Sequence, residues 1–216
     1  MNKAKTIFFA LCLCWLIAIP VPITAQTAGY TKHDVKGRVQ LEIPSDWAVS
    51  DAEQRKRVRE RAGELDGSLS HHTASLAAQS YLTRSQTMVR VSFVPIEPPL
   101  TQADVRQAVQ ANKQQILKEL ADFWRDGSPV MWTSLAKLGK MEVGLPRFAV
   151  KPIGGRTALI TSYASASIDN PAETTRVTQY HVPMGAEKAL ITLSYREGDQ
   201  QAISVSNRLK NSIVIR

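Results

Sequence analysis

The stretch TQYHVPMGAEKALITLSYREGD, residues 178–199, gives the clearest indication of the fold of this chain. Its second half places apolar or aromatic residues at every other position: Ala189, Ile191, Leu193 and Tyr195. A period of two is typical of a half-buried β-strand. Four residues typical of a turn separate this run from the preceding one: Pro183, Met184, Gly185 and Ala186. The stretch therefore predicts an antiparallel hairpin with strands over 174–182 and 188–195.

The rest of the C-terminal half continues the series of strands and then adds a helix. A Gly-Gly turn at 154–155 precedes alternating residues over 156–167, and a stretch near 148–151 is interpreted as the strand before it. A helix is expected over 199–210, because its inward residues recur at helical spacing: Ala202, Val205 and Leu209. The last residues, 213–215, are expected to add a short edge strand.

The N-terminal half begins with strands. Residues 38–43 alternate and end at Pro44, which predicts a strand after a short polar lead. Residues 74–82 and 87–95 predict a hairpin joined through 83–86, and the second strand turns three residues inward: Val89, Val91 and Phe93. Three prolines are expected to end its ladder pairing, because proline has no backbone N–H: Pro95, Pro98 and Pro99.

Two capping-box patterns predict helices in the same half. Ser50 to Glu53 opens a helix that should end near Leu65, and its inward residues are few: Val58, Ala62 and Leu65. Thr101 to Asp104 opens the longest helix, which Gly127 and Pro129 are expected to end. Its inward stripe consists of Val105, Val109, Asn112, Ile116, Leu120 and Phe123, widened by Ala108, Leu117 and Trp124.

Runs of strands with hairpin-length links, separated by helices, favour an α+β fold over a parallel sheet built from βαβ units. The residues by themselves therefore predict an α+β layer fold with an antiparallel sheet in its C-terminal half. The length of the chain is that of one domain, expected over 26–216 with a core over about 38–216.

The first 25 residues have the order of a secretory signal peptide. Lys3 and Lys5 precede an apolar run over 7–19, and two prolines and the small residue Ala25 follow. Because the run is short for a bilayer span, we expect cleavage after Ala25 and export to the periplasm. The alternative is an inner-membrane anchor formed by the uncleaved segment.

Removal of this segment changes the composition of the chain. Cys12 and Cys14 leave with it, so the remainder can form no disulfide and offers no thiolate as nucleophile or metal ligand. The net charge falls from +8 to +6, because Lys3 and Lys5 are lost and 25 Lys and Arg remain against 19 Asp and Glu. Outside the cytoplasm, this charge favours anionic head groups or an acidic protein as partner and disfavours nucleic acid.

Few residues suit catalysis or metal binding. The chain has four histidines, interpreted as loop or surface residues without metal-ligand spacing: His33, His71, His72 and His181. No serine lies in a nucleophile-elbow motif, and the Gly-Gly turn precedes a strand rather than a helix, unlike a phosphate loop. Three tryptophans are interpreted as core packing rather than a ligand wall: Trp47, Trp124 and Trp132. We therefore expect no catalytic residue, metal or cofactor.

A basic run lies in the first predicted helix: Arg55, Lys56, Arg57, Arg59 and Arg61. A narrow apolar stripe with basic residues elsewhere is typical of a solvated face, which we favour over a partner-binding surface. Membrane insertion is disfavoured because the stripe is small and has no Trp or Phe. Charge alone would give weak, salt-sensitive contact with an anionic membrane surface. The run is nevertheless the candidate interaction surface of the sequence.

Four segments together resemble the PsbP-like superfamily: VQLEIPSDW (39–47), IGGRTALITSYAS (153–165), the hairpin stretch (178–199) and NRLKNSIVI (207–215). The resemblance spans nearly all of 39–215, and its motifs are structural. It implies an antiparallel β-sheet sandwiched between helices, an α/β/α arrangement. It also implies a non-catalytic, protein-binding role and supplies no active-site residues. Export makes the chain most similar to the DcrB-like periplasmic members of that superfamily.

Three functional hypotheses follow. The first is an exported, periplasmic, non-catalytic protein-binding or scaffolding module that contacts an envelope protein. The alternative is a periplasmic lipid or small-molecule binding protein with an aromatic-lined cleft between sheet and helix. A hydrolase with an unrecognised site is the third. The sequence does not identify the partner or the oligomeric state.

Overall fold

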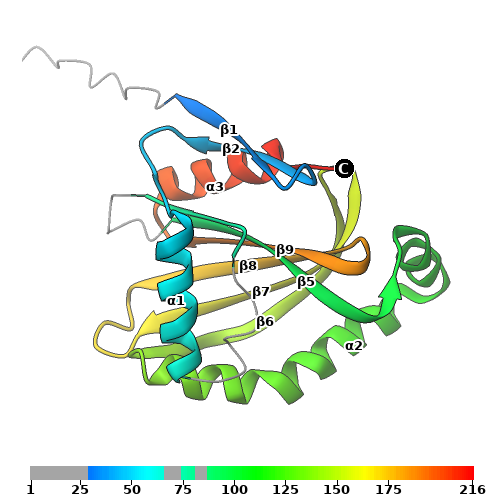
Figure 1. Cartoon of the computed structure of the whole chain (residues 1–216). Coiled ribbons are helices and arrows are strands. Elements are labelled where there is room, and N and C mark those ends of the chain that lie inside the picture. The colour runs from blue at the N-terminus through cyan, green and yellow to red at the C-terminus, as the bar shows by residue number, and fades with distance from the viewer. Residues whose placement is uncertain (1–28, 66–73, 81–86) are drawn as a thin grey trace, which may run out of the picture.

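The computed structural model describes residues 29–65, 74–80 and 87–216, without the side chains of 61–65 (Figure 1). Several sequence predictions therefore lie outside the described residues. They concern the signal segment 1–25, His71, His72, the turn over 83–86 and the side chains of Arg61, Ala62 and Leu65.

The described chain forms two antiparallel sheets and three helices. The elements are β1 (Tyr30–Val35), β2 (Val39–Pro44), β3 (Ala48–Val49), α1 (Ala52–Leu65), β4 (Leu76–Gln79), β5 (Met88–Leu100), α2 (Gln102–Ala136), β6 (Lys140–Ile153), β7 (Arg156–Ser167), β8 (Thr174–Pro183), β9 (Gly185–Arg196), α3 (Gln200–Ser212) and β10 (Val214–Ile215). The larger sheet has the order β3-β4-β5-β9-β8-β7-β6, and the smaller has the order β1-β2-β10. The predicted α+β class with an antiparallel sheet between helices is confirmed, although a second sheet shares the covering layer.

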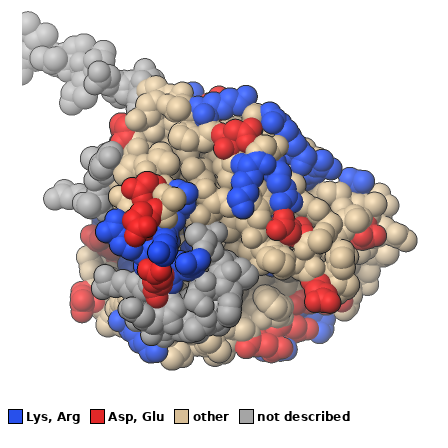
Figure 2. Space-filling view, viewed as in Figure 1, with Lys and Arg blue, Asp and Glu red and all other residues tan. Residues whose placement is uncertain are grey.

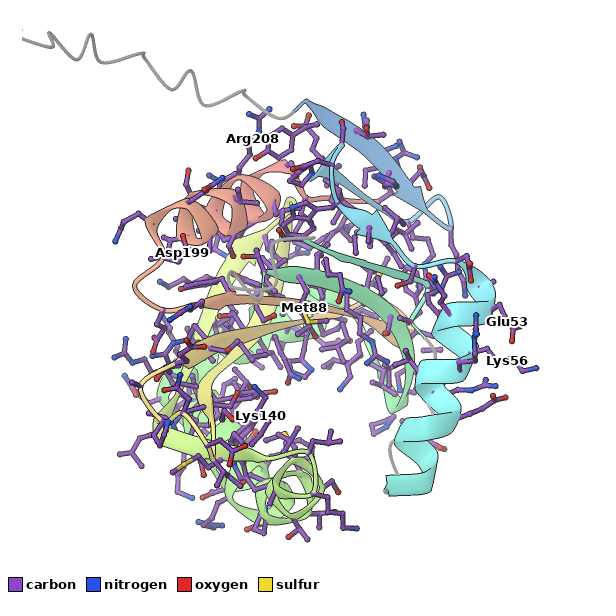
Figure 3. All side chains as sticks on the ribbon, turned by 90° about the vertical axis from the view of Figure 1, so that its left-hand side faces the viewer. Glu53, Lys56, Met88, Lys140, Asp199 and Arg208 are labelled. Atoms are coloured by element: carbon purple, nitrogen blue, oxygen red, sulfur yellow. The ribbon has the colours of Figure 1, made fainter. Side chains whose placement is uncertain are left out.

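The layers follow from the two faces of the larger sheet. Helix α3 and the smaller sheet lie on one side, whereas α1 and α2 lie on the other (Figures 1 and 3). The β8–β9 hairpin sets the faces, because Tyr180 pairs with Ile191 and Val182 pairs with Ala189. Directly opposed residues share a face, so this apolar set points toward α3 and the smaller sheet.

The core lies between the larger sheet, α3 and the smaller sheet. Its largest fully buried apolar side chains are Leu41, Ile43, Ile191, Leu193, Leu209, Val39, Val89, Val91 and Val182. Full burial of one such side chain stabilises the fold by about 1.5 to 3 kcal/mol relative to exposure. The sheet and the C-terminal helix therefore depend on each other for stability.

Helix α3 agrees with its sequence prediction. Asp199 is its N-cap, and the Asp199 carboxylate accepts a hydrogen bond from the Ala202 backbone N–H at 3.0 Å. Ala202 and Leu209 are 3% and 0% exposed, so the expected stripe faces the core. The short strand predicted at the end of the chain is β10, which pairs with β2 at the edge of the smaller sheet.

The Gly-Gly turn at 154–155 joins β6 to β7 and supports β10. Both glycines have positive φ, and the Ile215 backbone N–H donates to the Gly154 carbonyl at 3.1 Å. A Cβ on Gly154 would lie 3.0 Å from the Ile213 carbonyl oxygen and from the Ile215 nitrogen. Glycine is therefore needed at 154 for conformation and for close approach of the backbone.

The predicted end of the long helix is wrong, and its predicted inward stripe holds only in part: Val105 is 3% exposed, whereas Asn112 and Phe123 are exposed. Helix α2 passes Gly127 and Pro129 and continues to Ala136, because tertiary packing of its last turns overrides local propensity. Asn112 has non-helical φ and ψ of −159° and 86°, and its side chain accepts from the Gln115 N–H as a new cap would. The helical phase therefore restarts there, and Phe123 is 76% exposed instead of inward.

Strand boundaries also differ from the predictions. Strand β1 was not expected, because its exposed side makes it resemble a polar lead. Strand β6 begins at Lys140 rather than near 148, since a register shift between Val143 and Arg147 interrupts its alternation. Pairing of β5 with β9 stops after Pro95, as expected, but resumes where Leu100 pairs with Gly185. The prolines between Pro95 and Leu100 therefore interrupt the ladder only locally, at an irregularity in the pairing where proline is tolerated.

Candidate functional site

Helix α1 carries the basic run, and its start lies one residue later than the sequence suggested. The Gln54 N–H donates to Asp51 Oδ1 at 2.7 Å, and the Asp51 N–H donates to Gln54 Oε1 at 3.1 Å. This reciprocal pair is the capping box, rather than the predicted Ser50–Glu53 pair.

The basic side chains of α1 divide into two groups. Lys56 and Arg57 are exposed, and Lys56 lies 3.9 Å from Glu60. Arg55 and Arg59 are half-buried, and Arg55 donates to the Ser50 carbonyl oxygen. Figure 3 shows Lys56 on the side of α1 that points away from the sheet, and Figure 2 shows basic and acidic side chains gathered over this helix. The favoured interpretation of a solvated face therefore fits Lys56 and Arg57.

The one described residue of the predicted apolar stripe of α1 is not packed as predicted. Val58 was expected to point inward, yet it is 65% exposed. The apolar core lies on the opposite side of the larger sheet, between that sheet and α3, so α1 has no access to it. Helix α1 thus presents cationic and apolar groups together.

The sheet face on the side of α1 and α2 is polar near its centre. Because Ala189, Ile191 and Leu193 face the core, the alternate residues of β9 face the other way. Buried hydroxyl groups lie on this second face: Ser92, Thr161, Thr175 and Ser194, each under 9% exposed. Lys188 and Arg90 lie there as well, and burial lowers the pKa of both side chains.

His181 also faces this side, on β8 between Leu159 and Leu190. The prediction of a loop or surface histidine is wrong for His181, because it lies inside a strand and is mostly surrounded by protein. Burial, with a smaller contribution from the Lys188 charge, lowers the pKa of His181 to about 4. The imidazole is therefore neutral at neutral pH.

The tryptophans pack as expected. Trp47 is 8% exposed and belongs to the apolar core. Trp124 and Trp132 of α2 contact Tyr163 of β7, with ring centroids 4.9 Å and 5.6 Å apart. Burial raises the pKa of Tyr163 to about 12. Trp132 and Tyr163 meet edge to face, so these rings fix the second part of α2 on the sheet.

A cavity of about 400 Å³ opens at the other end of the molecule from α1. It lies between the first turn of α2, the β8–β9 turn and the end of the chain, and its lining consists of Thr101, Gln102, Ala103, Arg156, Pro183, Met184, Gly185 and Arg216. Sequence reasoning missed this site. Its one sequence signal was the basic residue directly after the Gly-Gly turn, Arg156.

Within residues 29–65, 74–80 and 87–216, no group of three or more His, Cys, Asp or Glu could hold a metal ion. None of the helices in this described part combines the length and the apolar character needed to cross a bilayer. His33, the other histidine there, lies half-buried on β1.

Comparison with solved structures identifies the fold. The chain is similar to cyanobacterial PsbP (CyanoP) from Synechocystis sp. PCC 6803, with a TM-score of 0.50 and 11% identity over 89% of this chain and 96% of that chain. The fold is PsbP-like. A scan against protein-family models and a search of curated proteins gave no match.

Two further solved structures align with this chain. One is a protein from Bacteroides thetaiotaomicron VPI-5482, with a TM-score of 0.45 and 8% identity over 88% of this chain and 49% of that chain. The other is LpqN, involved in cell envelope biogenesis of Mycobacterium tuberculosis, with a TM-score of 0.39 and 12% identity over 89% of this chain and 87% of that chain.

Proposed function

We propose that this PsbP-like protein is an exported, non-catalytic binding module that docks an acidic envelope protein through α1. Export to the periplasm rests on the signal-like order of residues 1–25, and a relationship to the DcrB-like proteins is part of the same proposal. The PsbP-like fold supports a binding role by analogy with the protein-binding members of that superfamily.

The exposed apolar group on a cationic helix carries the proposal. Helix α3 buries its apolar stripe in the core, whereas α1 leaves Val58 65% exposed next to Lys56 and Arg57. An apolar residue that is left exposed on a helix can contact the groove of a partner. The stripe predicted by helical spacing also includes Ala62 and Leu65.

The charge of α1 selects the partner. The helix sequence contains five basic residues, Arg55, Lys56, Arg57, Arg59 and Arg61, against Glu53, Glu60 and Glu64. Complementary charge around a small apolar contact increases the association rate and favours an acidic surface. An anionic bilayer would attract the same charge, but α1 has no Trp or Phe to insert into it.

Site-specific photo-crosslinking in the native host tests the proposal. A photoreactive residue replaces Val58 on α1, and a matched control replaces Phe123, which is exposed on α2. We expect the Val58 position, but not the Phe123 position, to capture an envelope protein with an acidic contact surface.

Charge reversal then tests the chemistry of that contact. Lys56→Glu with Arg57→Glu should weaken the captured complex by about tenfold and change the free energy of unfolding by under about 0.5 kcal/mol. Lys113→Glu with Lys151→Glu, on α2 and β6, is the matched control because both side chains are exposed. Equal loss in both pairs, capture from both positions, or binding only to anionic vesicles would refute the proposed docking surface.

A further inference from the structure

We propose that the cavity between α2, the β8–β9 turn and the end of the chain binds the oxyanion group, phosphate or carboxylate, of a small organic molecule. This site is separate from α1 and does not depend on partner docking.

The lining of the cavity has the composition of an anion site. Its residues include two arginines, Arg156 and Arg216, and no Asp or Glu. Its volume of about 400 Å³ is within the range of small-ligand sites. Pro183, Met184 and Ala103 add apolar surface beside the arginines, which suits the carbon skeleton of an organic anion.

The cavity is held in shape by one backbone hydrogen bond and by the Gln102 side chain. The Gly154 turn lies against β10 through the Ile215–Gly154 hydrogen bond, which holds the start of β7 near the end of the chain. Gln102, 9% exposed, donates from Nε2 to the carbonyl oxygens of Thr157 at 3.1 Å and Pro183 at 2.9 Å. Its Oε1 accepts from the Thr157 N–H at 2.8 Å. Helix α2 and strands β7 and β8 are thereby fixed around the cavity before any ligand binds.

The charges around the cavity leave Arg156 without an internal counter-ion. Arg216 lies 3.3 Å from Asp34, and Arg38 pairs with Glu187 at 2.5 Å. In the described part of the chain, Arg156 forms no ion pair with a carboxylate. A guanidinium that forms no ion pair, in a pocket whose lining has no Asp or Glu side chain, is suited to bidentate recognition of an oxyanion.

A further arginine, Arg38, lies beside the cavity but is already paired with Glu187. The Arg38 guanidinium lies 4.4 Å from the ring centroid of Phe93, and Lys36 Nζ lies 5.6 Å from it. Arg38 also approaches the sulfur of Met184, a lining residue, at 3.8 Å. Figure 2 shows Lys and Arg atoms gathered toward the upper right, where Figure 1 places the end of the chain. The backbone N–H groups at the start of α2 are not proposed as anion ligands. The capping box already provides them with an acceptor, since the Thr101 N–H donates to the Asp104 carboxylate.

The decisive variant adds a carboxylate to the cavity without harm to the fold. Ala103 is exposed in the first turn of α2, where glutamate is favourable for the helix. Ala103→Glu should therefore fold and place a negative charge beside the arginines, and Ala103→Gln is the control of similar size without charge. Arg156→Ala removes the unpaired guanidinium, and Arg147→Ala is the matched control on exposed β6.

Isothermal titration calorimetry at low salt measures binding of three soluble probes: inorganic phosphate, glycerol 3-phosphate and succinate. Flotation with phosphatidylglycerol vesicles tests whether the anion is instead a lipid head group. We expect the full chain to bind at least one of these four probes. The affinity should fall about tenfold or more in Arg156→Ala and Ala103→Glu but stay within about twofold in Arg147→Ala and Ala103→Gln. Absence of binding to all four probes, or equal loss in variants and controls, would overturn the proposal.

Discussion

Replacement of Gly154 by alanine tests whether the turn at 154–155 holds β10 on the core. Gly154 and Gly155 both have positive φ, of 55° and 80°. Alanine in this region costs about 1 to 2 kcal/mol in either position. Part of this cost is offset by about 0.4 to 1 kcal/mol, because alanine restricts the unfolded chain more than glycine does. Conformation alone therefore predicts a similar, small effect at the two positions.

The surroundings of the two glycines differ. A Cβ on Gly155 would meet no atom within 4 Å. A Cβ on Gly154 would lie 3.0 Å from the Ile213 carbonyl oxygen, the Ile215 nitrogen and Ile215 Cγ1. Two of these atoms belong to the backbone, so the segment 213–215 must shift, and the side chains of Ile213 and Ile215 are only 3% and 5% exposed. Overpacking of this kind costs about 1 to 3 kcal/mol.

We therefore expect Gly154→Ala to lower the free energy of unfolding by about 1 to 3 kcal/mol more than Gly155→Ala. Urea denaturation followed by circular dichroism measures this difference, and the melting temperature should differ by about 2 to 4 °C per kcal/mol for a chain of this size. If Gly155→Ala destabilised the protein as much as Gly154→Ala, the close approach of β10 would not be what requires glycine at 154.

Two further predictions concern the interior. Gln102→Ala should lower the free energy of unfolding by about 2 to 4 kcal/mol, because it leaves groups of Thr157 and Pro183 without partners. Exposed Gln107→Ala on the same helix should change it by under about 0.5 kcal/mol in the same urea titration, and equal effects would refute the bridging role of Gln102. The pKa of His181 is about 4 in the folded protein and 6.5 in the unfolded chain. Between these pH values the unfolded chain binds more protons than the folded protein, so the free energy of unfolding falls as the pH falls. His181→Gln should remove about 2 kcal/mol of the stability loss between pH 7.5 and 4.5, and an unchanged pH profile would contradict the buried neutral imidazole.

Local sequence rules succeeded where one face of an element is buried and the other is exposed. The β8–β9 hairpin and α3 follow directly from spacing, because their inward residues bury against a single core. They failed where a pattern runs through a backbone break. The predicted apolar stripe of α2 continues without a break through Asn112. The dihedral angles of Asn112 are not helical, so the residues after it face different directions from those predicted. Spacing alone cannot reveal that break, because asparagine is tolerated both within a helix and at its cap.

The candidate sites divide in the same way. The basic run of α1 could be located from sequence, since it lies in one contiguous helix. The exposure of Val58 could not be predicted from the sequence, because it depends on which side of the sheet the core occupies. Similarly, the environment of His181 depends on the position of β8 between β9 and β7, and the residue type alone does not predict it.

The α+β class, the positions of most strands along the chain and the glycines of the 154–155 turn follow from the residues alone, because these depend on periodicity and on local conformation. The meeting of Arg156, Gln102 and Arg216 around one cavity is visible only in the folded molecule. These residues lie in β7, in α2 and at the last position of the chain. Their meeting depends on strand order and on how closely backbones approach, and these are properties of the packed molecule that residue spacing does not encode.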